Sequence, residues 1–429
     1  MLRFLTIVVL FPLAFYGAKL TILPVDFYRL LYPIFLGVFV FYILHSRTFY
    51  IDYVAAPEIK LIFWLFVISL LFASIVSLYT GNFDFTYLRM HLDYILTCSV
   101  VLPLICRFYA TSRLSKYDVP FIITAMGTVQ ALIMIAMLLS FEFQSFVFQF
   151  IDIGDANNRL ESIYRFRAIG LTGFASYSMA VCQSFIAYMF IPLWMGLRKP
   201  YIFALSLLAF IIVVISALLS ARTAFIFLIP LYLWITVAAI STFGSKFSNR
   251  LLVALLVSVS VISIAIFAIS AFGDETFELM ISWILEFFSN YSDSGQLSTA
   301  STESTKELFF LPSETTILFG DGLYLVNGLY YMQTDIGYLR ILLYGGIVGS
   351  FLFYAPFVLL FYFGFFYTKK IYGLQFSFLI TVFLVLMFIV NIKGSIFFDG
   401  FSALKFITLY ILLLGVYCRK QSKNSRMGL

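Results

Sequence analysis

Apolar and polar positions alternate along this chain in whole segments rather than residue by residue. Runs of about 20 apolar residues follow one another, separated mostly by short polar connections. A helix needs roughly 20 such residues to cross the hydrocarbon of a bilayer. The pattern therefore predicts an all-α, polytopic bundle of about twelve transmembrane helices. The predicted spans are 4–20, 27–44, 61–79, 88–106, 119–140, 174–196, 201–218, 222–243, 251–271, 335–363, 373–391 and 401–418.

Two longer segments interrupt the regular hairpins. Residues 141–173 begin with a phenylalanine-rich stretch and continue into a charged part, and residues 273–334 form the long polar loop of the chain. Inside that loop, apolar residues recur at helical spacing while polar residues take the other face. This predicts an amphipathic helix on the membrane surface or over the end of the bundle. Its apolar face consists of Phe277, Met280, Ile281, Ile284, Leu285 and Phe288.

Composition sets the class of protein. Of 429 residues, 62% are hydrophobic and 11% charged, and the mean hydropathy is +1.03, which excludes a water-soluble globule. No linker separates two folding units, so residues 1–429 are expected to form a single transmembrane domain. The first apolar run is compatible with a cleaved signal peptide, but the topology described next requires it as a span.

The distribution of Lys and Arg predicts the orientation. If the N-terminus is cytoplasmic, most of the 27 basic residues fall on the inner side, with Asp52, Glu58 and Asp118 the acids that join them. Both termini are then cytoplasmic, and 141–173 and 273–334 lie outside. This asymmetry explains the net charge of +6, so no nucleic-acid partner is expected. The four cysteines lie in or beside spans and favour neither a disulfide framework nor a metal site. No motif for a metal or nucleotide cofactor is present.

Basic side chains nevertheless stand near the outer end of every helix that runs inward. At a helix N-terminus a cation opposes the macrodipole, at a cost of roughly 0.3–1 kcal/mol. For Arg29, Arg89 and Lys405 we favour snorkelling, in which the side chain reaches towards lipid phosphates. For a second group of four arginines there are two alternative interpretations, which are snorkelling and a shared binding site for phosphate or pyrophosphate. This second group is Arg165, Arg167, Arg222 and Arg340.

Asp335 is the acidic candidate beside these cations. It either caps the helix that follows or takes a proton from an attacking hydroxyl. Behind it, Gly345, Gly346 and Gly349 form a small-residue face for close helix packing. His91 either satisfies its ring nitrogens inside the bundle or faces a cavity, where it would bind substrate.

Four short segments resemble the bacterial O-antigen polymerases, a family of multi-spanning inner-membrane enzymes. They are 165–176, 219–224, 334–340 and 343–349. The family's outer-loop pattern of Arg, ten residues and Gly is matched by Arg159 and Gly170. The second loop departs from the pattern, because Lys306 is its single basic residue.

The resemblance implies glycosyl transfer on the periplasmic face of the bacterial inner membrane. Oligosaccharide repeat units linked to undecaprenyl pyrophosphate would be joined without metal or nucleotide. Membrane lipids and a chain-length-determinant protein are the further expected partners. It implies catalytic roles for Asp335, Arg222 and Arg340. Substrate-binding roles are implied for Arg159, Arg165, Arg167, Gly170, His91 and Tyr338.

Two alternatives remain at this stage. The related O-antigen ligases are expected to carry a functional histidine in the large outer loop, and 273–334 contains none. A flippase or other transporter would favour internal repeats and charges at mid-membrane, whereas the charges here gather towards one face.

Overall fold

The computed structural model describes residues 57–97, 115–151, 170–172, 176–272, 300–397 and 401–426, with short groups between 15 and 45, at 102 and between 282 and 295. These residues are almost entirely helical, which confirms the all-α class. They divide into two compact units, which are described in turn. The first holds Met1–Leu31, Lys116–Thr299 and Ser402–Phe406, and the second holds Tyr32–Ser115, Ala300–Phe401 and Ile407–Leu429. The single domain predicted for 1–429 stays a prediction.

The first unit is built around one buried helix, α10. Every residue from Ser178 to Trp194 is buried, and α10 contacts α8, α11, α12 and α13. Its large apolar side chains explain this place at the centre of the unit. The unit's elements are α8 (Asp118–Leu139), α9 (Phe141–Phe150), the 3-10 turn η5 (Gly170–Thr172), α10 (Ser176–Gly196), α11 (Pro200–Ser220), α12 (Ala224–Ser241) and α13 (Lys246–Phe272).

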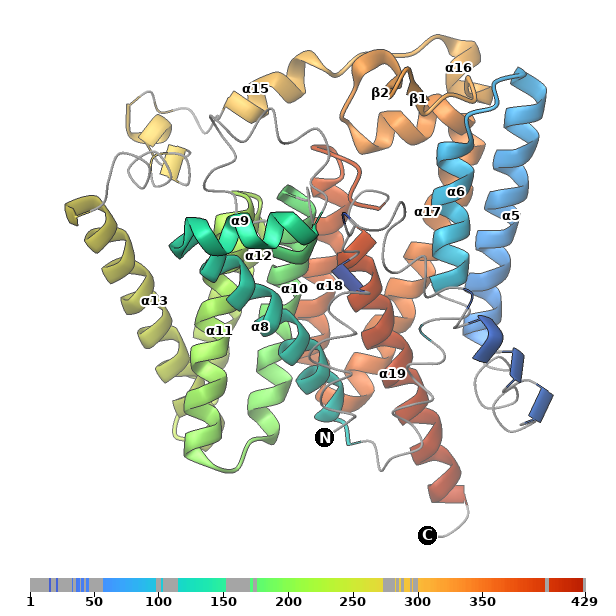
Figure 1. Cartoon of the computed structure of the whole chain (residues 1–429). Coiled ribbons are helices and arrows are strands. Elements are labelled where there is room, and N and C mark those ends of the chain that lie inside the picture. The colour runs from blue at the N-terminus through green and yellow to red at the C-terminus, as the bar shows by residue number, and fades with distance from the viewer. Residues whose placement is uncertain are drawn as a thin grey trace. The chain divides into compact units, whose positions relative to one another are not determined.

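Helix α9 is the described part of the first long segment, and it runs crosswise to α8 (Figure 1). Ser140 starts it, because its hydroxyl accepts a hydrogen bond from the Phe143 N–H at 3.1 Å. Phe141, Phe146 and Phe150 are exposed. An amphipathic helix with exposed phenylalanines suits a position in the interfacial layer of a membrane.

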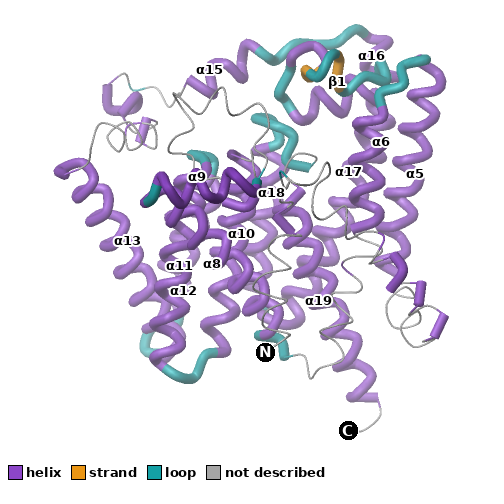
Figure 2. The backbone as a smooth tube through the Cα atoms, in the orientation of Figure 1, coloured by secondary structure: helices purple, strands orange, loops and turns teal. Residues whose placement is uncertain are grey.

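The second unit pairs α5 with α17. Its elements are α5 (Pro57–Thr80), α6 (Phe85–Leu96), α15 (Ala300–Glu307), α16 (Glu314–Phe319), β1 (Leu325–Val326), β2 (Leu329–Tyr330), η6 (Tyr331–Gln333), α17 (Gly337–Tyr372) and α18 (Leu374–Val390). The last helix, α19 (Phe401–Arg426), contributes to both units. The antiparallel ribbon β1–β2 lies near α16 (Figure 2).

Seven described helices are long and apolar enough to cross a membrane, and they mark the chain as a multi-pass membrane protein. They are Lys60–Thr80, Asp118–Leu139, Tyr177–Gly196, Pro200–Ser220, Ala224–Ser241, Lys246–Ser263 and Gly337–Tyr372, and each overlaps a predicted span. The shorter apolar helix Leu374–Val390 overlaps another. The spans predicted at 4–20 and 27–44 lie mostly outside the described residues. Of the predicted amphipathic helix, the described residues 282 and 285–286 are helical.

The tenth predicted span, 335–363, differs most from expectation, because α17 is broken at Gly346. This glycine has φ 63° and ψ −164°, a conformation that residues with a Cβ rarely adopt. The break frees the carbonyls of Leu343 and Tyr344, which accept hydrogen bonds from the Asp321 and Gly322 N–H groups at 2.6 and 3.0 Å. A turn of the long polar loop therefore completes the backbone hydrogen bonding of a broken apolar helix.

The two neighbouring glycines have an ordinary packing role. Cβ atoms built on Gly345 and Gly349 would approach the Phe72 ring of α5 at 3.6 and 3.0 Å. The small-residue face predicted from the sequence is therefore present at these positions. Gly346 does not belong to it, since its Cβ would lie 2.4 Å from the carbonyl oxygen of Leu318 in α16.

Gly346→Ala should destabilise the protein while Gly345→Ala should be nearly neutral. Alanine at 346 costs of order 1–3 kcal/mol because this backbone conformation is essentially restricted to glycine, and its methyl group also collides with a backbone carbonyl. Alanine at 345 meets an ordinary contact and favours helix. Thermal unfolding of the purified variants in detergent measures both effects. Equal losses of melting temperature would show that the break does not depend on glycine.

Candidate functional site

Asp335 stands at the entrance to α17 but does not cap it. The N-cap residue is Ile336, no side chain caps the helix, and the nearby Thr334 hydroxyl accepts from the Ile336 N–H at 3.3 Å. The Asp335 carboxylate instead accepts from Arg340 at 2.7 Å. The capping interpretation is therefore wrong, because an arginine one turn further along the helix takes the carboxylate. The Asp335 side chain remains 59% exposed.

The side chain of Arg340 is buried and contacts other groups of the protein. Its side chain is 3% exposed, and its guanidinium donates to the Thr334 carbonyl at 3.0 Å, to Asp335, and to the Tyr324 hydroxyl at 3.5 Å. Its Cζ atom lies 3.2 Å from the centre of the Tyr330 ring. A planar cation with donors in several directions can satisfy a carbonyl, a carboxylate and an aromatic face together. These contacts join the start of α17 to the loop before it.

That loop holds unusual backbone conformations. Asn327 and Gly328 form the turn of the β1–β2 ribbon with φ values of 53° and 79°, as the right-handed twist of a tight hairpin favours. Met332 and Gln333 also have positive φ, at 54° and 53°, directly before Thr334. Each such residue costs of order 1 kcal/mol or more, so the surrounding contacts must hold it in place.

A second acidic residue anchors the other end of the loop. The Asp84 carboxylate accepts from the N–H groups of Tyr324 and Leu325 at 2.7 and 2.6 Å, and from its own helix at Thr86 at 2.9 Å. Asn82 donates to the Asp321 carbonyl at 2.8 Å. The connection between α5 and α6 therefore fixes the position of the ribbon.

Tyr331 adds a neutral hydroxyl close to Asp335 in sequence. Burial, and then the nearby Asp321 carboxylate, raise the pKa of its phenol above the ordinary value. Both causes disfavour the phenolate. Tyr331 therefore stays a hydrogen-bond donor and acceptor at neutral pH and does not serve as a base.

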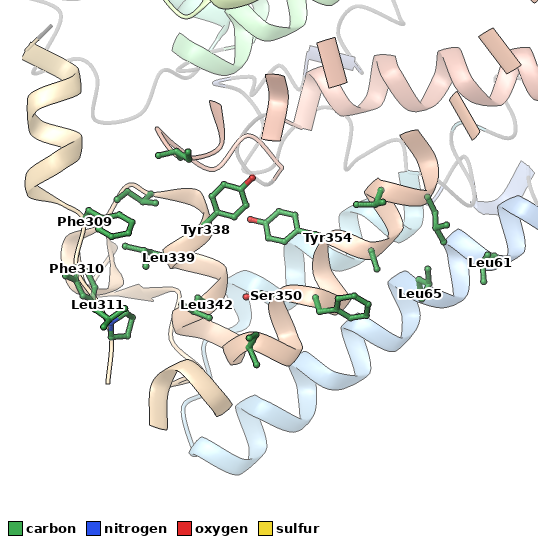
Figure 3. A pocket seen from close by; sticks show the side chains of 18 residues that line it. Leu61, Leu65, Phe309, Phe310, Leu311, Tyr338, Leu339, Leu342, Ser350 and Tyr354 are labelled. Carbon is green, nitrogen blue, oxygen red and sulfur yellow. The ribbon is translucent and has the colours of Figure 1, made fainter. Parts of the chain in front are cut away.

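An apolar groove of about 1010 Å³ is lined in part by Ile336, the residue that follows Asp335 in the sequence (Figure 3). It is lined by the segment 309–312, by α17 from Ile336 to Leu359, and by Leu61 and Leu65 of α5. Its polar lining comes from Ser350, Tyr338 and Tyr354. The two tyrosine hydroxyls point towards one another in Figure 3, and their rings are 5.4 Å apart. The groove therefore offers hydrocarbon contacts along one side of α17.

The other residues expected in the site have varied surroundings. His91 is buried, with its ring nitrogens within hydrogen-bond distance of the Ser69 hydroxyl, at 2.8 Å, and the Tyr87 carbonyl, at 3.3 Å. This matches the interpretation of a histidine satisfied inside the bundle. Tyr338 lines the groove, and its hydroxyl donates to the Phe388 carbonyl at 2.6 Å.

In the first unit, Arg222 lies in the turn between α11 and α12 and forms an ion pair with Glu286 of the long loop. Gly170 is buried with φ 59°, and a Cβ there would lie 2.2 Å from the Gln130 amide nitrogen. Both the backbone conformation and the close packing on Gln130 therefore favour glycine at this position. Arg159, Arg165 and Arg167 lie outside the described residues.

Lys405 in the first unit was expected to snorkel, but it is 5% exposed. Its ammonium donates to the Phe15 carbonyl oxygen at 3.4 Å. Snorkelling is therefore wrong for Lys405, because its cation points into the protein.

Sequence reasoning missed the groups that hold Asp335 and Arg340. Tyr324, Tyr330 and Asp84 come from separate parts of the chain, and no spacing pattern links them. No sequence pattern indicates that the backbone carbonyl of Thr334 accepts a hydrogen bond from Arg340. The hairpin turn Asn327-Gly328 was the available signal, because this dipeptide favours the tight turn that places Tyr324 and Tyr330 near each other.

No group of three or more metal-ligand side chains lies together among the residues that the structure describes. No family model, curated protein or solved structure matches the chain. The resemblance to O-antigen polymerases therefore stays a prediction. The geometry itself combines an exposed carboxylate, held by a buried guanidinium, with a long apolar groove. The apolar lining of the groove suits a ligand that carries a hydrocarbon chain.

Arg340→Lys should destabilise the loop although it keeps the charge. An ammonium cannot match the planar fork, so buried acceptors lose partners, at a cost of about 1–3 kcal/mol. We expect a lower melting temperature in detergent and faster proteolysis between residues 325 and 336. Asp335→Asn is the control, because its exposed ion pair contributes less than about 1 kcal/mol. Wild-type stability in Arg340→Lys would show that Arg340 does not anchor the loop.

Proposed function

We propose that this protein is an O-antigen polymerase that joins oligosaccharide repeat units carried on undecaprenyl pyrophosphate, on the periplasmic face of the inner membrane. The observation that carries the proposal is the exposed Asp335 carboxylate, which is fixed by Arg340 and directly precedes Ile336 of the apolar groove. A soluble sugar has no hydrocarbon chain that could bind in this groove. A sugar attached to a long lipid could bind the groove with its lipid and react at the Asp335 carboxylate.

The lining of the groove favours a substrate with a hydrocarbon chain. On α17 this lining extends over both sides of the break at Gly346. Phe309 and Phe310 line the groove and supply apolar contacts for the chain.

The proposed reaction transfers a polymer from its pyrophosphate carrier to the hydroxyl of a single lipid-linked unit. Asp335 takes the proton of that hydroxyl, the oxygen attacks the anomeric carbon, and the bond from sugar to pyrophosphate breaks. The resemblance assigns Arg222, Arg165 and Arg167 to the charge that develops on the leaving pyrophosphate. Arg340 acts as a positioning residue, because its contacts orient Asp335. The donor is already activated, so the step needs no nucleotide.

The proposal includes a topology of about twelve spans, with both termini in the cytoplasm and residues 273–334 in the periplasm. This orientation puts Asp335 at the outer end of α17. The basic residues of the inner connections support it. A chain-length-determinant protein is the proposed partner that would set the number of repeats.

Deletion of the gene, followed by electrophoresis of the surface polysaccharide, tests the proposal. Loss of a polymerase should leave surface lipid that carries single repeat units. Expression of the protein from a plasmid should then restore the long polymer. Polymer stranded on its lipid carrier would identify a ligase instead. Repeat units stranded on the cytoplasmic side would identify a flippase.

Asp335→Asn should abolish polymerisation without unfolding the protein. An amide accepts hydrogen bonds but has no useful basicity, and losing a general base costs about 10²–10⁴ in rate. Turnover of purified lipid-linked repeat units measures the effect, at matched protein levels. Glu314→Gln, at the start of α16, is the control with the same loss of charge and should retain normal turnover. A normal rate in Asp335→Asn would rule out its role as the base.

A further inference from the structure

Thr334 connects the apolar groove with the residues that hold Asp335. It is completely buried, and its hydroxyl donates to the Leu308 carbonyl and accepts from the Ile336 N–H, both at 3.3 Å. Its own carbonyl accepts from the Arg340 guanidinium at 3.0 Å. The same guanidinium donates to the Asp335 carboxylate. One buried residue therefore contacts both the groove and the group that orients the carboxylate.

Both partners of the Thr334 hydroxyl belong to the walls of the groove or adjoin them. Leu308 directly precedes the lining segment 309–312 (Figure 3), and Ile336 is itself a lining residue. At its other end the segment runs into Ser313, whose hydroxyl accepts from the Thr316 N–H at 3.2 Å and starts α16. The segment 309–312 is therefore anchored by Thr334 at one end and by α16 at the other.

Two apolar side chains of this segment are exposed. Phe309 is 64% exposed and Leu311 is 84% exposed, and both line the groove. A hydrocarbon chain in the groove would pack against them and gain many dispersion contacts. These contacts would hold the segment 309–312, and with it the Leu308 carbonyl, in one arrangement.

The lining favours a hydrocarbon chain over a helix of another protein. The hydroxyls of Tyr338 and Ser350 donate to backbone carbonyls, and that of Tyr354 accepts from the Asn391 amide. Membrane helices associate through small residues and interhelical hydrogen bonds. The small lining residues are Ser350 and Ala355, and they lack the four-residue spacing that lets two helices approach closely.

The chain directly before Thr334 is strained. Met332 and Gln333 have φ values of 54° and 53°, so contacts outside these two residues must hold them. On one side the anchor is the hydrogen bond from the Tyr331 N–H to the Tyr324 carbonyl at 3.0 Å. On the other side the anchor is Thr334. Loss of its contacts would let the strained backbone relax and carry the next residue, Asp335, with it.

We propose that Thr334 is a positioning residue that couples binding of a hydrocarbon chain in the groove to the orientation of Asp335. A bound chain fixes the segment 309–312, and the Leu308 carbonyl then holds the Thr334 hydroxyl. The Thr334 carbonyl in turn holds Arg340 against the carboxylate. The role of Asp335 as the reacting group rests on the proposed function. The coupling between groove and carboxylate does not require it.

Undecaprenol, the chain of the proposed carrier without phosphate or sugar, tests the coupling on the full chain in a non-ionic detergent. At a free concentration of about ten times its dissociation constant it should slow proteolysis between residues 325 and 336 about tenfold, because cleavage follows the population of the open loop. Thr334→Val keeps the shape and the carbonyl but removes the hydroxyl. It should bind labelled undecaprenol normally and lose the protection, and Thr334→Ser should regain it.

Thr368→Val is the matched control. Thr368 is also completely buried, and its hydroxyl lies 3.0 Å from the Tyr410 hydroxyl, so the substitution removes a comparable contact elsewhere on α17. This variant should keep the full protection. Equal protection in Thr334→Val and in the wild-type protein would overturn the proposal. So would a wild-type protein that does not bind undecaprenol, or that binds it without protection of the loop.

A second variant tests the same path from the groove if Thr334→Val does not fold. Phe309→Ala/Leu311→Ala truncates two exposed side chains, which the fold should tolerate. At saturating undecaprenol it should show weaker protection, because the bound chain no longer holds the segment 309–312. Unchanged protection would contradict the coupling.

Turnover of lipid-linked repeat units separates the coupling from the proposed function. In the wild-type protein, kcat should be about tenfold higher or more for a unit on the full-length carrier than for the same unit on a short prenyl chain, because a misplaced base is a poor catalyst. Thr334→Val should remove this difference. Protection of the loop without any turnover would reject glycosyl transfer and leave the coupling intact. Turnover that is equal for the two carriers would reject the coupling alone.

Discussion

The candidate site depends on a buried guanidinium. A charge removed from water must find several partners, and Arg340 finds a carbonyl, a carboxylate, a hydroxyl and an aromatic ring within one short segment of chain. Because these partners lie in the loop before α17, the guanidinium ties that loop to the helix. Asp335 is held as a consequence, with its side chain still reaching solvent.

The break at Gly346 is the second constraint, and it links the polar loop to the membrane helix. A continuous helix would leave the Asp321 and Gly322 N–H groups without the carbonyls of Leu343 and Tyr344. By interrupting its own hydrogen bonding, α17 binds the loop that carries the strained residues Met332 and Gln333. The same helix then lines the groove. One element therefore positions both the carboxylate and the surface proposed for the lipid.

The outer arginines show how a protein interior changes the meaning of a charge pattern. Arg222 and Arg340 were expected to face an anion together, yet each is paired with a carboxylate of its own unit. A guanidinium in low dielectric gains most from the nearest carboxylate. A substrate pyrophosphate at either position would compete with Glu286 or Asp335. In the proposal Arg340 is therefore a positioning residue, and a pyrophosphate would bind Arg222 only by displacing Glu286.

The sequence by itself determined the all-α class, the spans that overlap the seven long apolar helices, and the small-residue contact at Gly345 and Gly349. These features follow from local pattern, because hydrocarbon demands long apolar helices and close packing demands small side chains. The tertiary structure alone decided that Asp335 pairs with Arg340 instead of capping α17, that Gly346 breaks the helix, and that Lys405 points inward. Each of these outcomes depends on partners distant in sequence, such as Tyr324, Leu318 and Phe15. Hydropathy records how apolar a segment is, but it does not record which atoms a polar group meets after folding.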